Sequence, residues 1–233
     1  LKDIPGEFTS ETMKEMQPND QPKSALGITW DVKRDEFVYG KFPTDTDVIF
    51  TKRGLVSAVM SIYDPLGLLA PIVCTAKIIV RRTFDAKCRW DDPLPDELEL
   101  EFRKWLHDLQ SIAHLRISRF VGRPGFGPVI RKELHAFADG ANPAYGCSVY
   151  IRLVGSDGQI FCSLIMAKTR VCPRKGKMTI HRIEISSAVL ASRMVTHLQR
   201  EVDENLDAIW IWTDSTSNLS YIKNETSRFH IFV

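Results

Sequence analysis

The sequence predicts a mixed α/β fold in which three antiparallel strands, a helix, a parallel strand and a second helix follow a mainly helical region. Residues 133–168 alternate apolar and polar side chains between short turns, as strands of an antiparallel meander do. Apolar residues then recur at helical spacing from residue 179. Residues 208–212 form a short apolar run bounded by acids, which predicts a strand covered on both faces. Because a strand, a crossover helix and a second strand form a right-handed unit, we expect the last strand to run parallel to the first.

The region before residue 120 has its own pattern. Two alternating segments around residues 33–35 predict a β-hairpin. Thr51 can cap a first helix, Pro71 suits the first turn of a second, and acids open a third at residue 96. The third helix places a set of apolar residues on one face, which predicts a buried stripe: Leu98, Phe102, Trp105, Leu106 and Leu109.

Composition shifts suggest three parts. Residues 1–25 are polar and lack sustained periodicity, which favours a lead-in or linker. A mainly helical domain with the hairpin then spans 26–120, and the α/β domain spans 130–233 and is truncated at its C-terminus. The glycine- and proline-rich stretch at 122–128 makes residues 121–129 the predicted boundary.

Three acidic residues stand at positions that this topology would bring together. Asp139 lies in the first strand of the meander, Glu184 near the start of the helix, and Asp214 after the apolar run. Each has an ordinary structural explanation, in a turn, at a helix N-terminus or as a helix cap, where Ser215 or Thr216 could serve as well. Together, however, carboxylates suit hard divalent cations such as Mg²⁺, and a two-metal site needs several of them.

Positive charge is concentrated just before Glu184. The net charge is only +2, yet residues 165–182 contain six cations and no acid: Lys168, Arg170, Arg174, Lys175, Lys177 and Arg182. Two interpretations remain open, a solvated loop and a loop that contacts the phosphates of a nucleic acid.

Cysteine usage and hydropathy bound the cellular setting. The five cysteines form no CxxC pair, which favours reduced thiols in an intracellular protein. The most apolar run, residues 65–80, is shorter than the roughly 20 residues that a bilayer span needs, so no membrane partner is expected. The chain opens without methionine and stops within an apparently structured stretch, so we expect a piece of a longer polyprotein.

Several motifs occur in an order that resembles one known family. They are LGITWD, YDPLGLLAP, ELHAFADGANPAYG, HRIEISSAVLASR, WTDSTSNLSYI and SRFHIFV. Nearly the whole chain is similar to the BEL/Pao retrotransposon polyprotein, in the part known as the Pao retrotransposon peptidase family. That part is similar to the end of a reverse transcriptase followed by its ribonuclease H domain.

The resemblance implies a thumb or connection region over 26–120 and a ribonuclease H-like domain over 130–233. It implies an endonuclease that hydrolyses the RNA strand of RNA–DNA hybrids, with Asp139, Glu184 and Asp214 as catalytic ligands of Mg²⁺ or Mn²⁺. The implied partners are the hybrid and the rest of the polyprotein, in a cytoplasmic virus-like particle or in the nucleus. Family enzymes use a fourth acid on a later element, so we expect this fragment to bind its second ion weakly.

Two other functions stay open. The fold could serve as a non-catalytic connector that binds hybrid, packing against the polymerase through its helices. The family's name implies an aspartic peptidase, whose paired carboxylates conventionally come from Asp-Thr/Ser-Gly loops. No such tripeptide occurs in the sequence.

Overall fold

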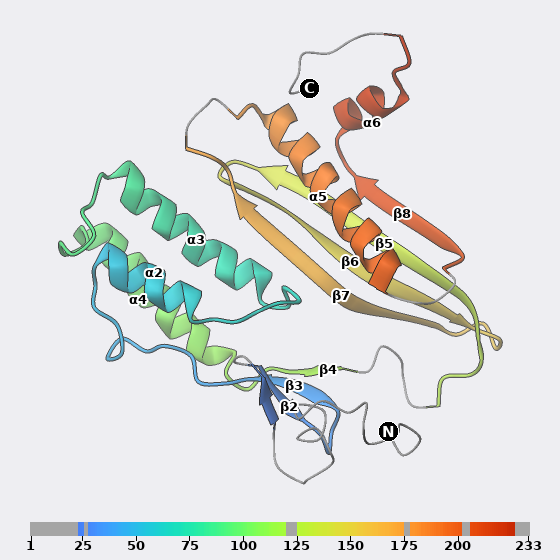
Figure 1. Cartoon of the computed structure of the whole chain (residues 1–233), viewed down its shortest axis with the longest axis horizontal. Coiled ribbons are helices and arrows are strands. Elements are labelled where there is room, and N and C mark those ends of the chain that lie inside the picture. The colour runs from blue at the N-terminus through green and yellow to red at the C-terminus, as the bar shows by residue number, and fades with distance from the viewer. Residues whose placement is uncertain (1–22, 26–27, 120–124, 175–177, 202–205, 227–233) are drawn as a thin grey trace, which may run out of the picture.

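The computed structural model describes residues 23–25, 28–119, 125–174, 178–201 and 206–226. Figure 1 shows a helical region beside the larger sheet, with the smaller sheet below it. Apart from two short strands, the helices and strands follow in the order that the sequence predicts. In chain order they are β1 (Lys23–Ala25), β2 (Ile28–Asp31), β3 (Glu36–Tyr39), α2 (Lys52–Met60), α3 (Ala70–Asp85), α4 (Asp96–Ser111), β4 (Arg116–Ser118), β5 (Val129–Ala141), β6 (Ala144–Gly155), β7 (Ile160–Val171), α5 (Ile180–Glu201), β8 (Ala208–Thr213) and α6 (Thr216–Lys223).

The larger sheet has the strand order β7-β6-β5-β8. Strands β5, β6 and β7 form the antiparallel meander, and β8 pairs parallel to β5. Helix α5 connects β7 to β8 and lies across one face of the sheet (Figure 1). The mixed α/β fold is therefore the ribonuclease H-like arrangement that the sequence predicts.

Helix α5 lies along this sheet because one side of it is apolar. Ile183, Leu190, Met194 and Leu198 are all at most 6% exposed, and Leu190, Met194 and Leu198 pack against Leu134 and other residues of the sheet. The first turn comes especially close to β5 at Gly140, where a Cβ would lie 2.8 Å from Ile183 Cγ2. The absence of a side chain at this glycine thus sets how near the start of α5 can come to Asp139.

The helical region has a hydrophobic core of its own. Thr51 caps α2, since its side chain accepts a hydrogen bond from the backbone N–H of Gly54 at 3.2 Å. The predicted stripe of α4 is buried, and Trp105 also donates from its indole nitrogen to the carbonyl of Ile72 at 3.0 Å. This hydrogen bond ties α4 to the start of α3.

The smaller sheet differs from the prediction in two places. Residues 23–25 were expected to belong to a linker, but they form β1 and pair with β2; residues 1–22 lie outside the described residues. The three-residue strand β4 was not predicted, and it pairs with β3 of the predicted hairpin. Strands this short carry too little periodicity to be recognised without their partners.

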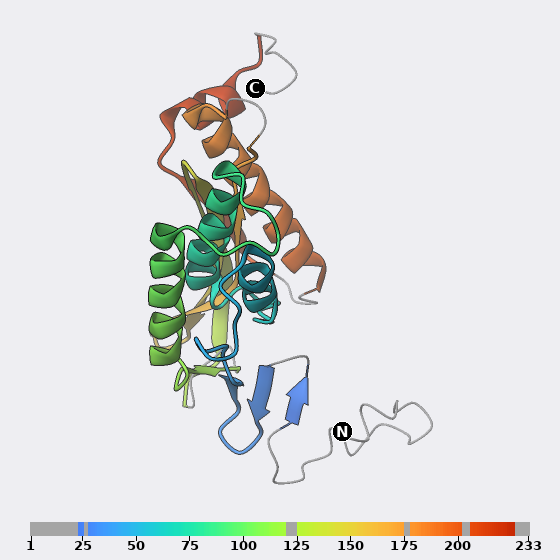
Figure 2. The ribbon, with the colours of Figure 1, turned by 90° about the vertical axis from the view of Figure 1, so that its left-hand side faces the viewer.

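The helical region and the larger sheet meet along β7. The backbone N–H of Ala167 donates to the carbonyl of Leu66 at 2.8 Å, and Arg174 Nε lies 2.8 Å from Asp85 Oδ1. Arg81 also donates to the carbonyl of Pro143 at 3.1 Å. Figure 2, turned by 90° from Figure 1, shows α5 in orange beside the sheet and the helical region in front of it. The predicted domain boundary at residues 121–129 stays a prediction.

The expectation that residues 208–212 are covered on both faces is wrong. Trp210, Ile211 and Trp212 of β8 are 44–48% exposed. The reason is that β8 is the edge strand of the sheet and that the described residues cover the face bearing the two tryptophans only in part. A short apolar run therefore does not by itself indicate a strand buried on both faces.

Candidate active site

Asp139 and Asp214 lie where the parallel pairing between β5 and β8 ends. The last paired residues of β5 and β8 are Ala138 and Thr213, so each aspartate is the next residue of its chain segment. Both line one groove of about 690 Å³, together with Phe137 and Trp212. We call this groove, on the sheet face away from α5, the acidic groove.

Glu184 reaches the same end of the sheet from the second turn of α5. Its Oε2 accepts a hydrogen bond from Ser215 Oγ at 2.6 Å, and His181 Nδ1 lies 3.9 Å from the same oxygen. Ser215, directly after Asp214, also caps α6 by accepting from the N–H of Asn218. The cap predicted for Ser215 is confirmed, and the same hydroxyl links α5 to the end of β8.

The carboxylates do not form a closed ligand set in the conformation described. Asp139 Oδ1 accepts from the N–H of Gly140 at 2.6 Å, while Glu184 is turned toward Ser215. Among the residues that the structure describes, no three His, Cys, Asp or Glu side chains are grouped so that they could hold a metal ion. The topology thus brings the three acids to one end of the sheet, and their metal binding stays a prediction.

The chemistry of this region nevertheless fits a divalent cation. Asp139 and Asp214 bring hard carboxylate oxygens to one groove, and no described cation is ion-paired with either. Asn218, three residues after Ser215, is 2% exposed, and neither its side-chain oxygen nor its nitrogen has a partner among the described residues. A buried amide of this kind needs a polar partner, and an ion with its water would supply one.

Two aromatic residues of the acidic groove were not predicted from the sequence. Phe137 and Trp212 each stand two positions before an acid, so they share its sheet face, and their rings stack with centroids 6.2 Å apart. The equal spacing in FAD and WTD was the signal that could have identified them. They give the acidic groove an apolar, half-exposed wall.

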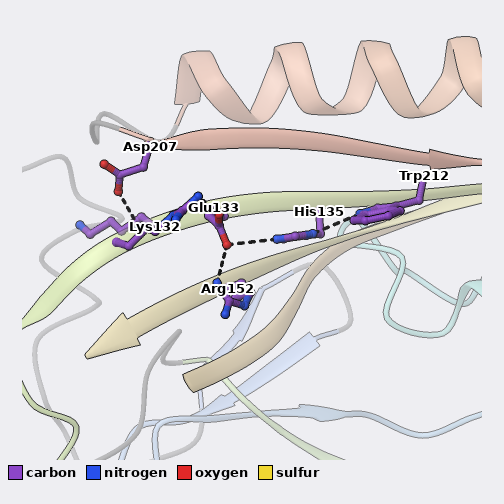
Figure 3. A network of polar contacts seen from close by, with 7 residues as sticks. Lys132, Glu133, His135, Arg152, Asp207 and Trp212 are labelled. Carbon is purple, nitrogen blue, oxygen red and sulfur yellow. Dashed lines mark hydrogen bonds and ion pairs between the residues drawn. The ribbon is translucent and has the colours of Figure 1, made fainter. Parts of the chain in front are cut away.

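On the same sheet face, a polar network extends from Trp212 in the direction away from the acids (Figure 3). Trp212 Nε1 donates to His135 Nδ1 at 3.1 Å, which leaves the other ring nitrogen to donate to Glu133 Oε2 at 3.4 Å. Glu133 is buried and also contacts Arg152 at 2.5 Å and Arg131 at 2.7 Å. Burial opposes the charge of Glu133, but its contacts with Arg152, His135 and Arg131 outweigh burial and lower its pKa.

Replacing Glu133 by Gln should lower the free energy of unfolding by about 2–3 kcal/mol at pH 7, because two arginines lose a buried partner. A group with a lowered pKa stabilises the fold above its unfolded pKa, and this contribution disappears as the pH falls through the folded pKa. The difference in free energy of unfolding between wild type and variant should therefore have its largest value at pH 7 and disappear at acidic pH. Urea denaturation at several pH values tests this, with the exposed Glu225→Gln as control. A difference that does not change with pH would contradict it.

The predicted phosphate-binding residues are divided between different surroundings. Lys168 and Arg170 are exposed and alternate with Thr169, so they project toward the α5 side, opposite Asp139. Arg174 is ion-paired with Asp85, and Arg182 lies in the first turn of α5. Lys175 and Lys177 lie outside the described residues. Nucleic-acid binding by this set stays a prediction.

Comparison with known proteins places the chain in a family. Residues 51–215 match the family model described as the Pao retrotransposon-like RNaseH-like domain. The match begins at the cap of α2 and ends at Ser215, so it includes the helical region, the meander, α5 and β8. A search of curated proteins found no match. Because the matched residues make up well over half of the sequence, the chain belongs to the family of Pao retrotransposon-like RNaseH-like domains.

Proposed function

We propose that this chain is the ribonuclease H-like part of a retrotransposon reverse transcriptase polyprotein and that it hydrolyses the RNA strand of RNA–DNA hybrids. The observation that carries the proposal is the convergence of Asp139, Asp214 and the Ser215-bound Glu184 at one end of the sheet. The family to which the chain belongs supports the same activity.

Each acidic residue would have a distinct part in holding Mg²⁺ or Mn²⁺. Asp139 and Asp214 would face the substrate from the acidic groove. Glu184 would complete the set, with Ser215 orienting its carboxylate. Divalent ions bound there would supply an activated water and stabilise the leaving oxygen. Phe137 and Trp212 would border the substrate and exclude water from one side of the groove.

A second candidate function is a connector that binds hybrid without cutting it. The exposed cations of β7, Lys168 and Arg170, favour this possibility because they lie on the α5 side of the sheet, opposite Asp139. Binding through these residues would not require catalysis at the acids.

The metal site can be tested without activity. Asp139 and Asp214 repel each other across adjacent strands, about 5 Å apart at the backbone, and a bound cation should relieve this repulsion. We expect 10 mM Mg²⁺ to raise the melting temperature of the wild type by about 2–4 °C, as binding worth about 1 kcal/mol would. Thermal unfolding followed by circular dichroism measures the shift.

The same measurement on variants separates a specific site from a general salt effect. Asp139→Asn should lose most of the shift, because it removes one ligand and the charge that repels Asp214. Asp92→Asn removes an exposed carboxylate that is distant in sequence from the acidic groove. This variant should show the same Mg²⁺-induced shift in melting temperature as the wild type. Equal shifts in all three proteins would count against the metal site.

A further inference from the structure

A second cleft lies on the opposite side of the sheet from the acidic groove. Its volume is about 540 Å³, and its floor is β7 between Met166 and Arg170. Helix α3 and the turn before it form one wall, and α5 forms the other; Figure 1 shows β7 between these two helices. The cleft therefore exists only because the helical region packs against the sheet.

Basic side chains from three elements line this cleft. Lys77 comes from α3, Lys168 and Arg170 from β7, and Arg193 and His197 from α5. On α5 the lining residues are spaced three or four apart, so they form one face of the helix. We call these five residues the basic cleft.

The acidic side chain that lines the cleft is already hydrogen-bonded within its own turn and to a tyrosine. Asp64 is the acid among its lining residues, and its carboxylate accepts from the hydroxyl of Tyr39 and from the N–H groups of Leu68 and Leu69, at 2.8–2.9 Å. A carboxylate that accepts three hydrogen bonds of this kind is held in place as part of the turn. This single carboxylate cannot also neutralise the four Lys and Arg side chains of the cleft.

The cations of the cleft lack the partners that arginines have elsewhere in the molecule. Among the described residues, Lys77, Lys168, Arg170 and Arg193 form no ion pair, and His197 lies 3.8 Å from the exposed Glu201. By contrast, ten other arginines of the described residues lie within 4 Å of a carboxylate: Arg34, Arg53, Arg81, Arg82, Arg103, Arg116, Arg119, Arg131, Arg152 and Arg174. Four unpaired cations around one cleft indicate an anionic ligand.

We propose that the basic cleft binds the sugar-phosphate backbone of a nucleic-acid strand. No Phe, Tyr or Trp side chain is among the described lining residues of the cleft, so contact would be made mainly with phosphates and would not depend on sequence. Register places this cleft level with the candidate active site, on the other face of the sheet. Thr169, between Lys168 and Arg170, lies in the same row as Asp139, two strands away and thus about 10 Å at the backbone.

The proposal rests on the proposed function for the identity of the strand, and its test is independent of catalysis. Binding of a fluorescent RNA–DNA hybrid to the full chain is measured by anisotropy in EDTA, at several salt concentrations. Lys77→Ala combined with Arg193→Ala should weaken binding about tenfold at 0.1 M salt. The slope of log affinity against log salt should fall by about 1–2, because two phosphate contacts are lost.

A matched pair of substitutions controls for lost charge. Lys104 on α4 and Arg89 are exposed and lie outside the cleft, so Lys104→Ala combined with Arg89→Ala removes the same charge elsewhere. This variant should bind as the wild type does, and an equal loss in both double variants would overturn the proposal. Arg193→Ala alone, at an exposed position, gives the same readout if the loss of Lys77 disturbs folding.

Competition identifies the ligand. Hybrid binding should persist in 10 mM inorganic phosphate and in the presence of polyglutamate. Displacement of the hybrid by phosphate alone would assign the cleft to a small anion. Displacement by polyglutamate would assign it to an acidic protein. Either result would contradict the proposal that the cleft binds a nucleic-acid strand. Asp139→Asn should retain binding in EDTA. Unchanged binding by the cleft variants, with cleavage still dependent on Asp214, would remove this proposal and leave the proposed function standing.

Discussion

Replacing Asp214 by Asn is expected to reduce cleavage of RNA within a hybrid by about 1,000-fold or more while leaving the fold intact. The ligand is worth several kcal/mol of transition-state stabilisation, and each 1.4 kcal/mol is a factor of ten. Asp214 is exposed and Asn has nearly the same shape, so little stability should be lost. The assay uses a polypeptide that continues past Val233, which allows for a fourth acid, and follows a labelled RNA strand with Mg²⁺ and with chelator.

The controls of this assay also decide between the other functions. Asp92→Asn should cleave as the wild type does, because this exposed residue lies outside the acidic groove. A peptidase would cut peptide at acidic pH and ignore chelator, since its carboxylates share a proton and need no metal. A connector would cut neither substrate and would still bind hybrid. If Asp214→Asn kept full activity, Asp214 could not be a catalytic ligand.

The sequence predicted those parts of the fold that depend on local periodicity and on the right-handed crossover. The meander alternates, α5 has one apolar face, and a strand after a crossover helix must return parallel to the first strand. These rules were sufficient to bring Asp139 and Asp214 to the same end of the sheet. They also placed Glu184 near the start of α5.

The rest depends on contacts between distant segments, which periodicity does not encode. The Glu184–Ser215 hydrogen bond depends on how deeply α5 sits against Gly140. The run of cations from Lys168 was predicted as one patch, but alternation along β7 and the ion pair of Arg174 divide it. Lys77 and Arg193 stand far from this run in sequence, so only the packing of α3 and α5 around β7 could assign them to the same cleft.

Replacing Gly67 by Ala should lower the free energy of unfolding by about 3–4 kcal/mol. Gly67 has a φ of +72°, a conformation that costs other residues about 1 kcal/mol or more, and its added Cβ would lie 1.7 Å from the carbonyl oxygen of Ala167. Overpacking against a strand that cannot easily move adds about 1–3 kcal/mol. The turn must therefore withdraw from β7, which breaks the hydrogen bond between Leu66 and Ala167.

Gly158→Ala separates these two causes. Gly158 has nearly the same backbone conformation, with a φ of +80°, but nothing lies within 4 Å of the position that its Cβ would occupy. This variant should lose only about 1 kcal/mol in urea denaturation, because it pays the conformational cost without the collision. Hydrogen exchange gives a second readout, since the amide of Ala167 should lose protection in Gly67→Ala alone. Equal destabilisation by both variants, with that amide still protected, would show that the turn does not hold the helical region against β7.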